Sequence, residues 1–249
     1  MGVPTPPPYP PTRPFALPAG RARPPAPTRC ARLCIQVYEM ARLSDDARFD
    51  ADPEYRDDML IGALVHDLGK SLSLFGEADG NVDCMNRVTN FTAGGGLDGL
   101  EFQYNHDQFG HDKLRANVRS GLMKLPPRVL DIVRLHSLRE MGALSEAVAR
   151  AAAARSSAAH AQASSASRAR AASAAMLLLA GEIVSEPERK AFREQISDPH
   201  DLTRAGFVLH FAEYDLHSKD RTHEIPAVDV GEIKRLLRKY ITDGLTIAW

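Results

Sequence analysis

Apolar residues recur at helical spacing in several separate segments of this chain. Between Cys30 and Ala47 the apolar residues Leu33, Val37 and Met40 lie three or four positions apart, which is the spacing of one helix face. Apolar and polar residues do not alternate, as they typically do in strands, over any length of the chain. We therefore expect an all-α fold, in which further helices cover residues 54–75, begin near 97 and 126, and cover 186–196, 202–218 and 230–241.

Two segments fall outside this helical pattern. Residues 1–29 contain eleven of the seventeen prolines and no acidic residue, and proline can neither propagate a helix nor donate a strand hydrogen bond. Residues 146–175 are mostly Ala, Ser and Arg, which give a core little to bury. We expect a disordered Pro-rich tail over 1–29 and one domain over 30–249, interrupted by a low-complexity insertion over 146–175.

Composition narrows the possible partners and the compartment. A net charge of -1 gives no basis for binding nucleic acid or a membrane surface, and no apolar run reaches the roughly 20 residues of a membrane span. Three dispersed cysteines are too few for a disulfide framework or a four-cysteine zinc site. We expect a cytoplasmic protein, while the basic, acid-free N-terminus leaves organelle targeting as the alternative.

The candidate chemistry lies where polar residues interrupt apolar helical segments. His66 and Asp67 follow such a run, and burying an ionised carboxylate without a partner costs several kcal/mol. Either His106 or His111 can face inward, but not both, because five residues turn a helix by about 140°. A metal ion would partner these groups, and imidazole with carboxylate and no thiolate favours iron or manganese over structural zinc. The candidate ligands are His66, Asp67, His106, His136 and Asp215.

Plainer interpretations of the same residues stay open. His66 and Asp67 can form the polar tip of an apolar helix, and His136 can be a core histidine with satisfied hydrogen bonds. Asp215 can be a solvated carboxylate that pairs with Lys219 one turn later.

Several motifs, taken in order, resemble those of the myo-inositol oxygenase family. An HD pair followed by lysine would alone indicate only the broad HD-domain class, but here the similar blocks cover about residues 55–141 and 200–249. They are HDLGK at 66–70 with LFGE at 74–77, GLD at 96–98 ahead of His106 and Asp107, LPP at 125–127 leading to RLHS at 134–137, FAEYDLHSK at 211–219, and the closing Lys239, Tyr240 and Trp249.

The resemblance implies an HD-domain-like helical bundle with a non-haem di-iron centre. Such an enzyme is an oxidoreductase of inositol catabolism, which cleaves the ring of myo-inositol with O₂ to give D-glucuronate, and we expect a monomer. The motifs imply a mixed-valent Fe(II)/Fe(III) pair, in which Asp67 bridges the two irons. The first iron would be bound by His66, Asp67 and Asp215, and the second by Asp67, His106 and His136.

The resemblance also implies residues that contact the substrate. A cation near the centre lowers the cost of placing a deprotonated alkoxide on the metal, and Lys70 is the expected catalytic residue for that reason. The positions that match substrate-contacting residues of the family are Lys70, Asp83, Ser137 and Lys219.

The chain departs from the family at one ligand. The family has a further histidine on the helix before HDLGK, whereas this chain has none before His66, and Leu33 aligns with that position. Leucine cannot coordinate a metal, so the first iron would keep only three protein ligands. An incomplete or divergent N-terminus would explain the difference. Two alternative functions therefore stay open: a metal-deficient, non-catalytic homologue that acts as a binding protein, and an HD-domain metal-dependent phosphohydrolase.

Overall fold

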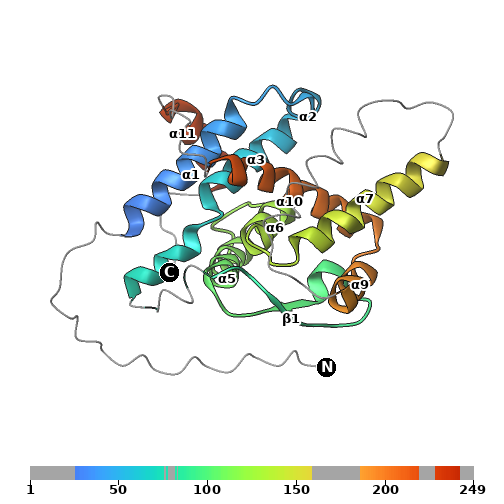
Figure 1. Cartoon of the computed structure of the whole chain (residues 1–249). Helices are drawn as coiled ribbons and strands as arrows, with labels where there is room; N and C mark the ends of the chain where they lie inside the picture. The colour runs from blue at the N-terminus through green and yellow to red at the C-terminus, as the bar shows by residue number, and fades with distance from the viewer. Residues whose placement is uncertain are drawn as a thin grey trace.

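A computed structural model describes residues 26–75, 77, 82, 84–158, 186–218 and 228–241. This described part is predominantly helical, as predicted (Figure 1). None of its helices is both long and apolar enough to cross a membrane. The elements are α1 (Ala26–Arg42), α2 (Ala47–Ala51), α3 (Pro53–Val65), the 3₁₀ helix η1 (Leu68–Phe75), β1 (Val88–Phe91), the 3₁₀ helix η2 (Gly96–Gly99), β2 (Leu100–Phe102), α5 (His106–Arg119), α6 (Pro127–Leu135), α7 (Met141–Ala158), α9 (Glu186–Gln195), α10 (Pro199–Ser218) and α11 (Val230–Tyr240).

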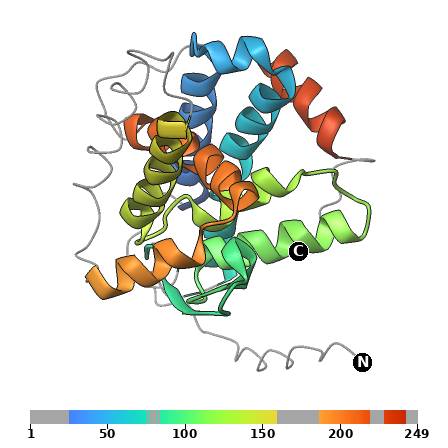
Figure 2. The ribbon, with the colours of Figure 1, turned by 90° about the vertical axis from the view of Figure 1, so that its right-hand side faces the viewer.

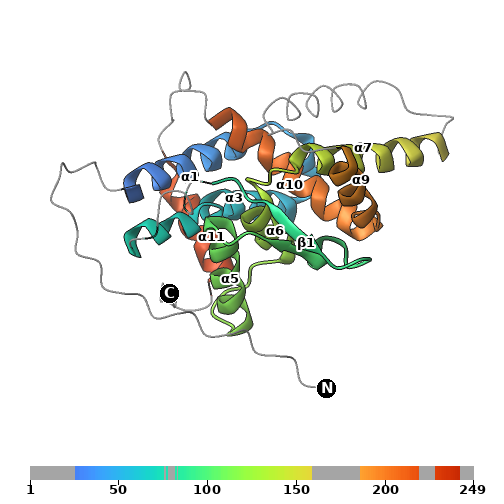
Figure 3. The ribbon, with the colours of Figure 1, turned by 60° about the horizontal axis from the view of Figure 1, so that its bottom comes forward.

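Helix α10 lies between two apolar cores. Its residues Phe207 and Phe211 pack into a core with α1, α3, α6 and α11, whereas Val208 and Ala212 pack into a second core with α7, α9 and β2. Figures 1 and 3 show α1 and α3 toward one end of the molecule and α7 and α9 toward the other. A helix that is apolar on two faces is buried on both, which accounts for the long apolar run in this segment.

Local sequence signals fix where the central helices begin. Asp52 caps α3 by accepting from the backbone N–H of Tyr55, and Pro53 occupies the first turn, where proline loses no hydrogen bond. Asn105 caps α5 by accepting from the N–H groups of Asp107 and Gln108. These caps determine the residue at which each helix begins. They therefore also determine the direction in which the polar side chains described below point.

Two predicted helices have different bounds in the structure. The segment expected as one helix over 54–75 is helical only to Val65, then continues after a turn as η1. The helix expected from about Leu97 begins at His106, because Gly96–Gly99 forms a single 3₁₀ turn that leads into β2. Glycines in this stretch shorten the regular elements, and Gly96 has a φ of 58° that favours glycine.

A small β-hairpin was missed by the sequence pattern. β1 and β2 pair antiparallel, with Val88 opposite Phe102 and Phe91 opposite Leu100. β1 has four residues and β2 three, and most of their side chains are exposed or half-buried. A run this short carries too few alternating positions to be distinguished from a loop.

The predicted tail and insertion lie largely outside the described residues, which do not include 1–25 or 159–185. α1 begins at Ala26, four positions before the predicted start of the domain. The low-complexity segment begins inside α7, where Ala147 is buried and Glu146 pairs with Arg193 of α9. Figure 2 shows α7 and α9 on the face that also carries the hairpin.

Arg204 connects α10 to α6 and to η2. Its guanidinium makes two parallel hydrogen bonds to Asp131, at 2.8 and 2.7 Å, and a third at 2.8 Å to Asp98. Asp201, one turn earlier, accepts from the backbone N–H of Leu97 at 2.9 Å. Bidentate charge-assisted pairs of this kind have a defined geometry, so the loop between the hairpin strands is held against α10.

His210 of α10 is buried in a polar network within the first core. Tyr55 Oη lies 2.8 Å from its Nδ1, and Tyr214 Oη lies 3.1 Å from its Nε2. Burial, with a further contribution from Arg48, lowers the pKa of His210 to about 4, although Asp46 opposes the shift. Since the folded state holds this imidazole neutral, it resists a proton that the unfolded chain accepts below about pH 6.5.

We expect the free energy of unfolding to decrease as the pH falls from about 6.5 to about 4, partly because of His210. A His210→Gln variant keeps a side chain that can hydrogen-bond both tyrosines but cannot titrate, so its stability should vary less with pH. Denaturant unfolding of both proteins with a metal chelator present measures the difference. A His200→Gln variant, at an exposed position of the same helix, should behave as the wild type. Equal pH dependence in the wild type and His210→Gln would contradict the assignment.

Candidate metal centre

Polar residues at the ends of several helices meet at one buried point. His66 is the C-cap of α3, His106 is the first residue of α5, and His136 is the C-cap of α6. Asp67 follows His66 in the turn before η1, and Asp215 lies on α10. Each of these five predicted ligands is less than 9% exposed. The structure thus gathers them from four separate segments of the chain.

The two carboxylate oxygens of Asp67 face different partners. Oδ1 lies 3.3 Å from His136 Nε2 and 3.5 Å from His106 Nε2. Oδ2 lies 3.7 Å from His66 Nε2 and 2.7 Å from Lys70 Nζ. Asp215 Oδ1 lies 3.8 Å from His66 Nε2 on the same side. Ligands about 2.0–2.2 Å from one ion are commonly about 3–4 Å apart, so these separations suit metal binding on both sides of Asp67.

The histidine orientations favour a cation at this point. His66 Nδ1 donates to the carbonyl of Ala63 at 2.9 Å, and His136 Nδ1 donates to that of Ile132 at 3.2 Å. A backbone carbonyl only accepts, so each neutral ring presents the lone pair of Nε2 to the Asp67 carboxylate. A lone pair and an anion repel unless a proton or a metal ion lies between them. This is the arrangement in which proteins present histidine to metals.

The surroundings of His106 also suit metal binding. Its side chain is 3% exposed, yet within the described residues neither ring nitrogen has a hydrogen-bond partner of normal alignment. The 2.8 Å contact between His106 Nε2 and Asp107 Oδ1 is an ion-pair distance without that alignment. Buried polar atoms are rarely left in this way, and a metal ion would satisfy His106.

The pKa shifts of the residues at this centre also favour a positive charge there. Burial alone would lower the pKa of His136, but the carboxylates of Asp107 and Asp67 raise it to about 9. Burial lowers the pKa of His66. Burial would raise the pKa of Asp67, whereas His66, His106 and His136 hold it far below the usual range. The centre therefore favours positive charge near Asp67.

The choice between His106 and His111 is decided by the start of α5. Because Asn105 caps the helix, His106 is in its first turn and points at Asp67, while His111 lies on another side. His111 Nδ1 instead contacts Asp112 Oδ1 at 3.2 Å. His111 is also buried, so burial alone could not have separated the two.

Asp107 joins the site, although no separate role was expected for it. It is fully buried, accepts a hydrogen bond from Ser137 Oγ, and lies 3.6 Å from His136 Nδ1. Ser137 also accepts from the backbone N–H of Asn86 at 3.1 Å. Asp107 therefore orients Ser137 and places negative charge beside His106 and His136. Its place directly after His106 was the signal available in the sequence.

Cys34 of α1 is the other residue that sequence reasoning missed. Its sulfur and ligand atoms of His66 and Asp67 all lie within 4.8 Å of one another. A second such group consists of Asp67, His106 and His136, so Asp67 belongs to both. The structure thus places a thiol beside the expected ligands, because the buried face of α1 carries Cys34 while Leu33 is only half-buried beside it.

The expected substrate residues are only partly described. Lys70 lies at the edge of the centre, with 25% of its side chain exposed, and Ser137 is half-buried. Asp83 and Lys219 lie outside the described residues, so the structure does not place them.

Comparisons with protein-family models, curated proteins and solved structures find no match for this chain.

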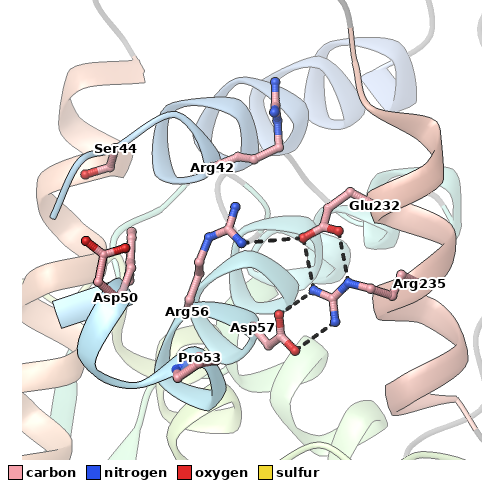
Figure 4. A pocket seen from close by; sticks show the side chains of 9 residues that line it. Arg42, Ser44, Asp50, Pro53, Arg56, Asp57, Glu232 and Arg235 are labelled. Carbon is pink, nitrogen blue, oxygen red and sulfur yellow. Dashed lines mark hydrogen bonds and ion pairs between the residues drawn. The ribbon is translucent and has the colours of Figure 1, made fainter. Parts of the chain in front are cut away.

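A surface pocket of about 550 Å³ lies apart from the centre, between α1, α3 and α11 (Figure 4). Its charged residues compensate one another: Arg235 donates to Asp57 and to Glu232, each at 2.9 Å, and Arg56 lies 3.9 Å from Glu232. Half-exposed pairs of this kind contribute little stability singly. The charged residues of the pocket therefore form ion pairs that connect α3 to α11.

Proposed function

We propose that this protein is an inositol oxygenase-like enzyme with two iron ions, which cleaves the ring of myo-inositol with O₂. The observation that supports it best is the position of Asp67, whose oxygens face His136 and His106 on one side and His66 on the other. A carboxylate shared in this way suits two ions rather than one. The type of reaction is proposed from the resemblance of the HDLGK motif, and of the ordered blocks that follow it, to the inositol oxygenase family.

The described residues have distinct tasks in this proposal. His66 and Asp215 would hold one iron, His106 and His136 would hold the other, and Asp67 would bridge the two. The backbone carbonyls of Ala63 and Ile132 keep the histidine rings in the orientation that binding requires. Such supporting contacts commonly change metal affinity or activity by about 10–100-fold.

The exposed edge of the centre is where a polyol would approach. Lys70 brings a positive charge to that edge, and a cation there stabilises a substrate hydroxyl that loses its proton. Ser137, oriented by Asp107, offers a hydroxyl on another side. The five candidate metal ligands are buried, and this burial keeps bulk water from the reacting atoms.

The overall reaction is balanced by one O₂. Myo-inositol and O₂ give D-glucuronate, one water and one proton, so the two carbons of the cleaved ring bond are oxidised, one to a carboxylate and one to an aldehyde, as O₂ is reduced by four electrons. The iron pair supplies the activation of O₂ when bound. The chain itself binds the polyol, orients it and holds the proton-exchanging groups near the ring.

The direct test is reconstitution of the full-length protein with ferrous iron without oxygen, followed by addition of myo-inositol and O₂. We expect about two irons per chain, and glucuronate formed in equal amount to the O₂ consumed. Phosphate release from nucleotides, with no glucuronate, would favour the phosphohydrolase. Two bound irons without either product would overturn the proposal, and failure to bind iron would favour a non-catalytic binding protein.

Two histidines of α5 provide a matched comparison for this test. His106→Gln should lose iron and product, because His106 faces Asp67, whereas His111→Gln should retain both, because His111 faces Asp112. Both side chains are buried, so a general packing defect would affect the two variants alike. Equal losses in both would count against the assignment of His106.

A further inference from the structure

Cys34 lies on the face of α1 that packs into the protein. Val37, Tyr38 and Ala41 follow it by three, four and seven positions, and all three are 0% exposed. Residues at this spacing lie on one helix face, so the thiol is directed inward with them. Leu33 is rotated from that face by about 100°, and its side chain is half-buried.

The inward face of α1 brings the Cys34 sulfur to the centre. The sulfur, a nitrogen of His66 and an oxygen of Asp67 lie within 4.8 Å of one another. Two ligands on opposite sides of one ion are about 4–4.6 Å apart at ordinary metal–sulfur and metal–nitrogen distances. The separations are therefore close to what a single ion needs, with small movements of the side chains.

We propose that Cys34 is a thiolate ligand of the first metal position, together with His66, Asp67 and Asp215. This deepens the proposed function and rests on it for the identity of the metal as iron. Leu33 leaves that position one donor short, and Cys34 supplies the donor from the next residue of the same helix. The first ion then has one sulfur, one nitrogen and two carboxylate groups as protein donors.

A sulfur donor changes which metals the first position prefers. Thiolate is a soft ligand that favours iron(II), cobalt(II) and zinc(II) over magnesium and manganese(II). It also adds a negative charge beside Asp67 and Asp215, which strengthens the attraction for a divalent ion. The second position has only imidazole and carboxylate ligands, so the two positions should differ in both affinity and spectrum.

Binding at the first position converts the Cys34 thiol into a thiolate. The sulfur–hydrogen bond breaks as the metal–sulfur bond forms, and the proton passes to solvent. No electron is transferred in this step, so it needs no oxidant.

The test is a titration of the metal-free, full-length protein with cobalt(II) in the absence of O₂. Thiolate-to-cobalt charge-transfer absorption should appear as the first position fills, and it requires no turnover. The Cys34→Ser variant should lose that absorption and bind its first ion at least about 10-fold more weakly. Loss of glucuronate formation with the absorption intact would overturn the proposed function and leave this ligand assignment standing.

Two further variants guard against a folding defect. Cys84→Ser, at a half-buried cysteine outside α1, should leave the charge-transfer absorption unchanged. Cys34→His should bind two ions per chain without that absorption, because imidazole restores a donor at the same place. Unchanged absorption in Cys34→Ser, or absorption that disappears in Cys84→Ser instead, would overturn the assignment.

Discussion

An Asp67→Asn variant is expected to lose both metal ions and with them all measurable ring cleavage. Asparagine has nearly the same shape, but its neutral amide cannot bridge two cations, and its NH₂ group replaces one carboxylate oxygen. Changes to groups that only support ligands already cost about 10–100-fold, so loss of the shared ligand should reduce kcat by more than about 1,000-fold. Metal analysis by mass spectrometry and a glucuronate assay measure the two effects.

Asp112→Asn is a suitable control for that variant. Asp112 is also a carboxylate in contact with a histidine, since it lies 3.2 Å from His111, but it is outside the centre. It should keep two irons and the activity. Circular dichroism should show the same helix content in both variants. Retention of two irons and full activity by Asp67→Asn would contradict the central role of Asp67.

A Gly69→Ala variant is expected to be destabilised by about 3 kcal/mol or more. A methyl group at this position would lie 1.7 Å from the carbonyl oxygen of His106 and 3.0 Å from the backbone N of Gly110. Both neighbours are backbone atoms of α5, so no side-chain rotation can relieve the contact. Either η1 or α5 must move, which would also separate Asp67 from His106. Denaturant unfolding with a chelator present isolates the stability effect from metal binding.

Gly206→Ala provides the opposite expectation in the same experiment. Gly206 lies within α10, and a methyl group there would have nothing within 4 Å. Alanine favours helix over glycine by about 0.5–1 kcal/mol, so this variant should be slightly more stable than the wild type. A Gly69→Ala protein as stable as Gly206→Ala would show that η1 and α5 do not approach as closely as described.

The long amphipathic helices were predictable because apolar side chains at helical spacing must be buried together. α9, α10 and α11 begin and end within a few residues of the expected positions. The break after Val65 was not predictable in this way, because Leu68, Leu72 and Phe75 of η1 keep a helical spacing with the apolar residues of α3 beyond His66 and Asp67. The turn depends on tertiary packing, in which Gly69 lets η1 lie against the start of α5.

The candidate site shows a similar limit. The residue types and their places within or directly after apolar segments indicated His66, Asp67, His106 and His136, and the structure brings these side chains together. The identity of the neighbouring donor on α1 depended on a single position, because one residue rotates a helix face by about 100°. Alignment by motif placed Leu33 at the position of the missing histidine, whereas packing of α1 against α3 and α10 turns Cys34 inward.

The helix-end positions of the ligands have a consequence for motion. Helix ends open more readily than helix interiors, and here α3, α5 and α6 each end or begin at a ligand. A bound ion would tie these ends together across large sequence separations, and each tenfold excess of metal over its dissociation constant stabilises the closed form by about 1.4 kcal/mol. Amide hydrogens next to His66, His106 and His136 should therefore exchange with solvent more slowly as metal is added, because a bound ion would restrict the opening of these helix ends.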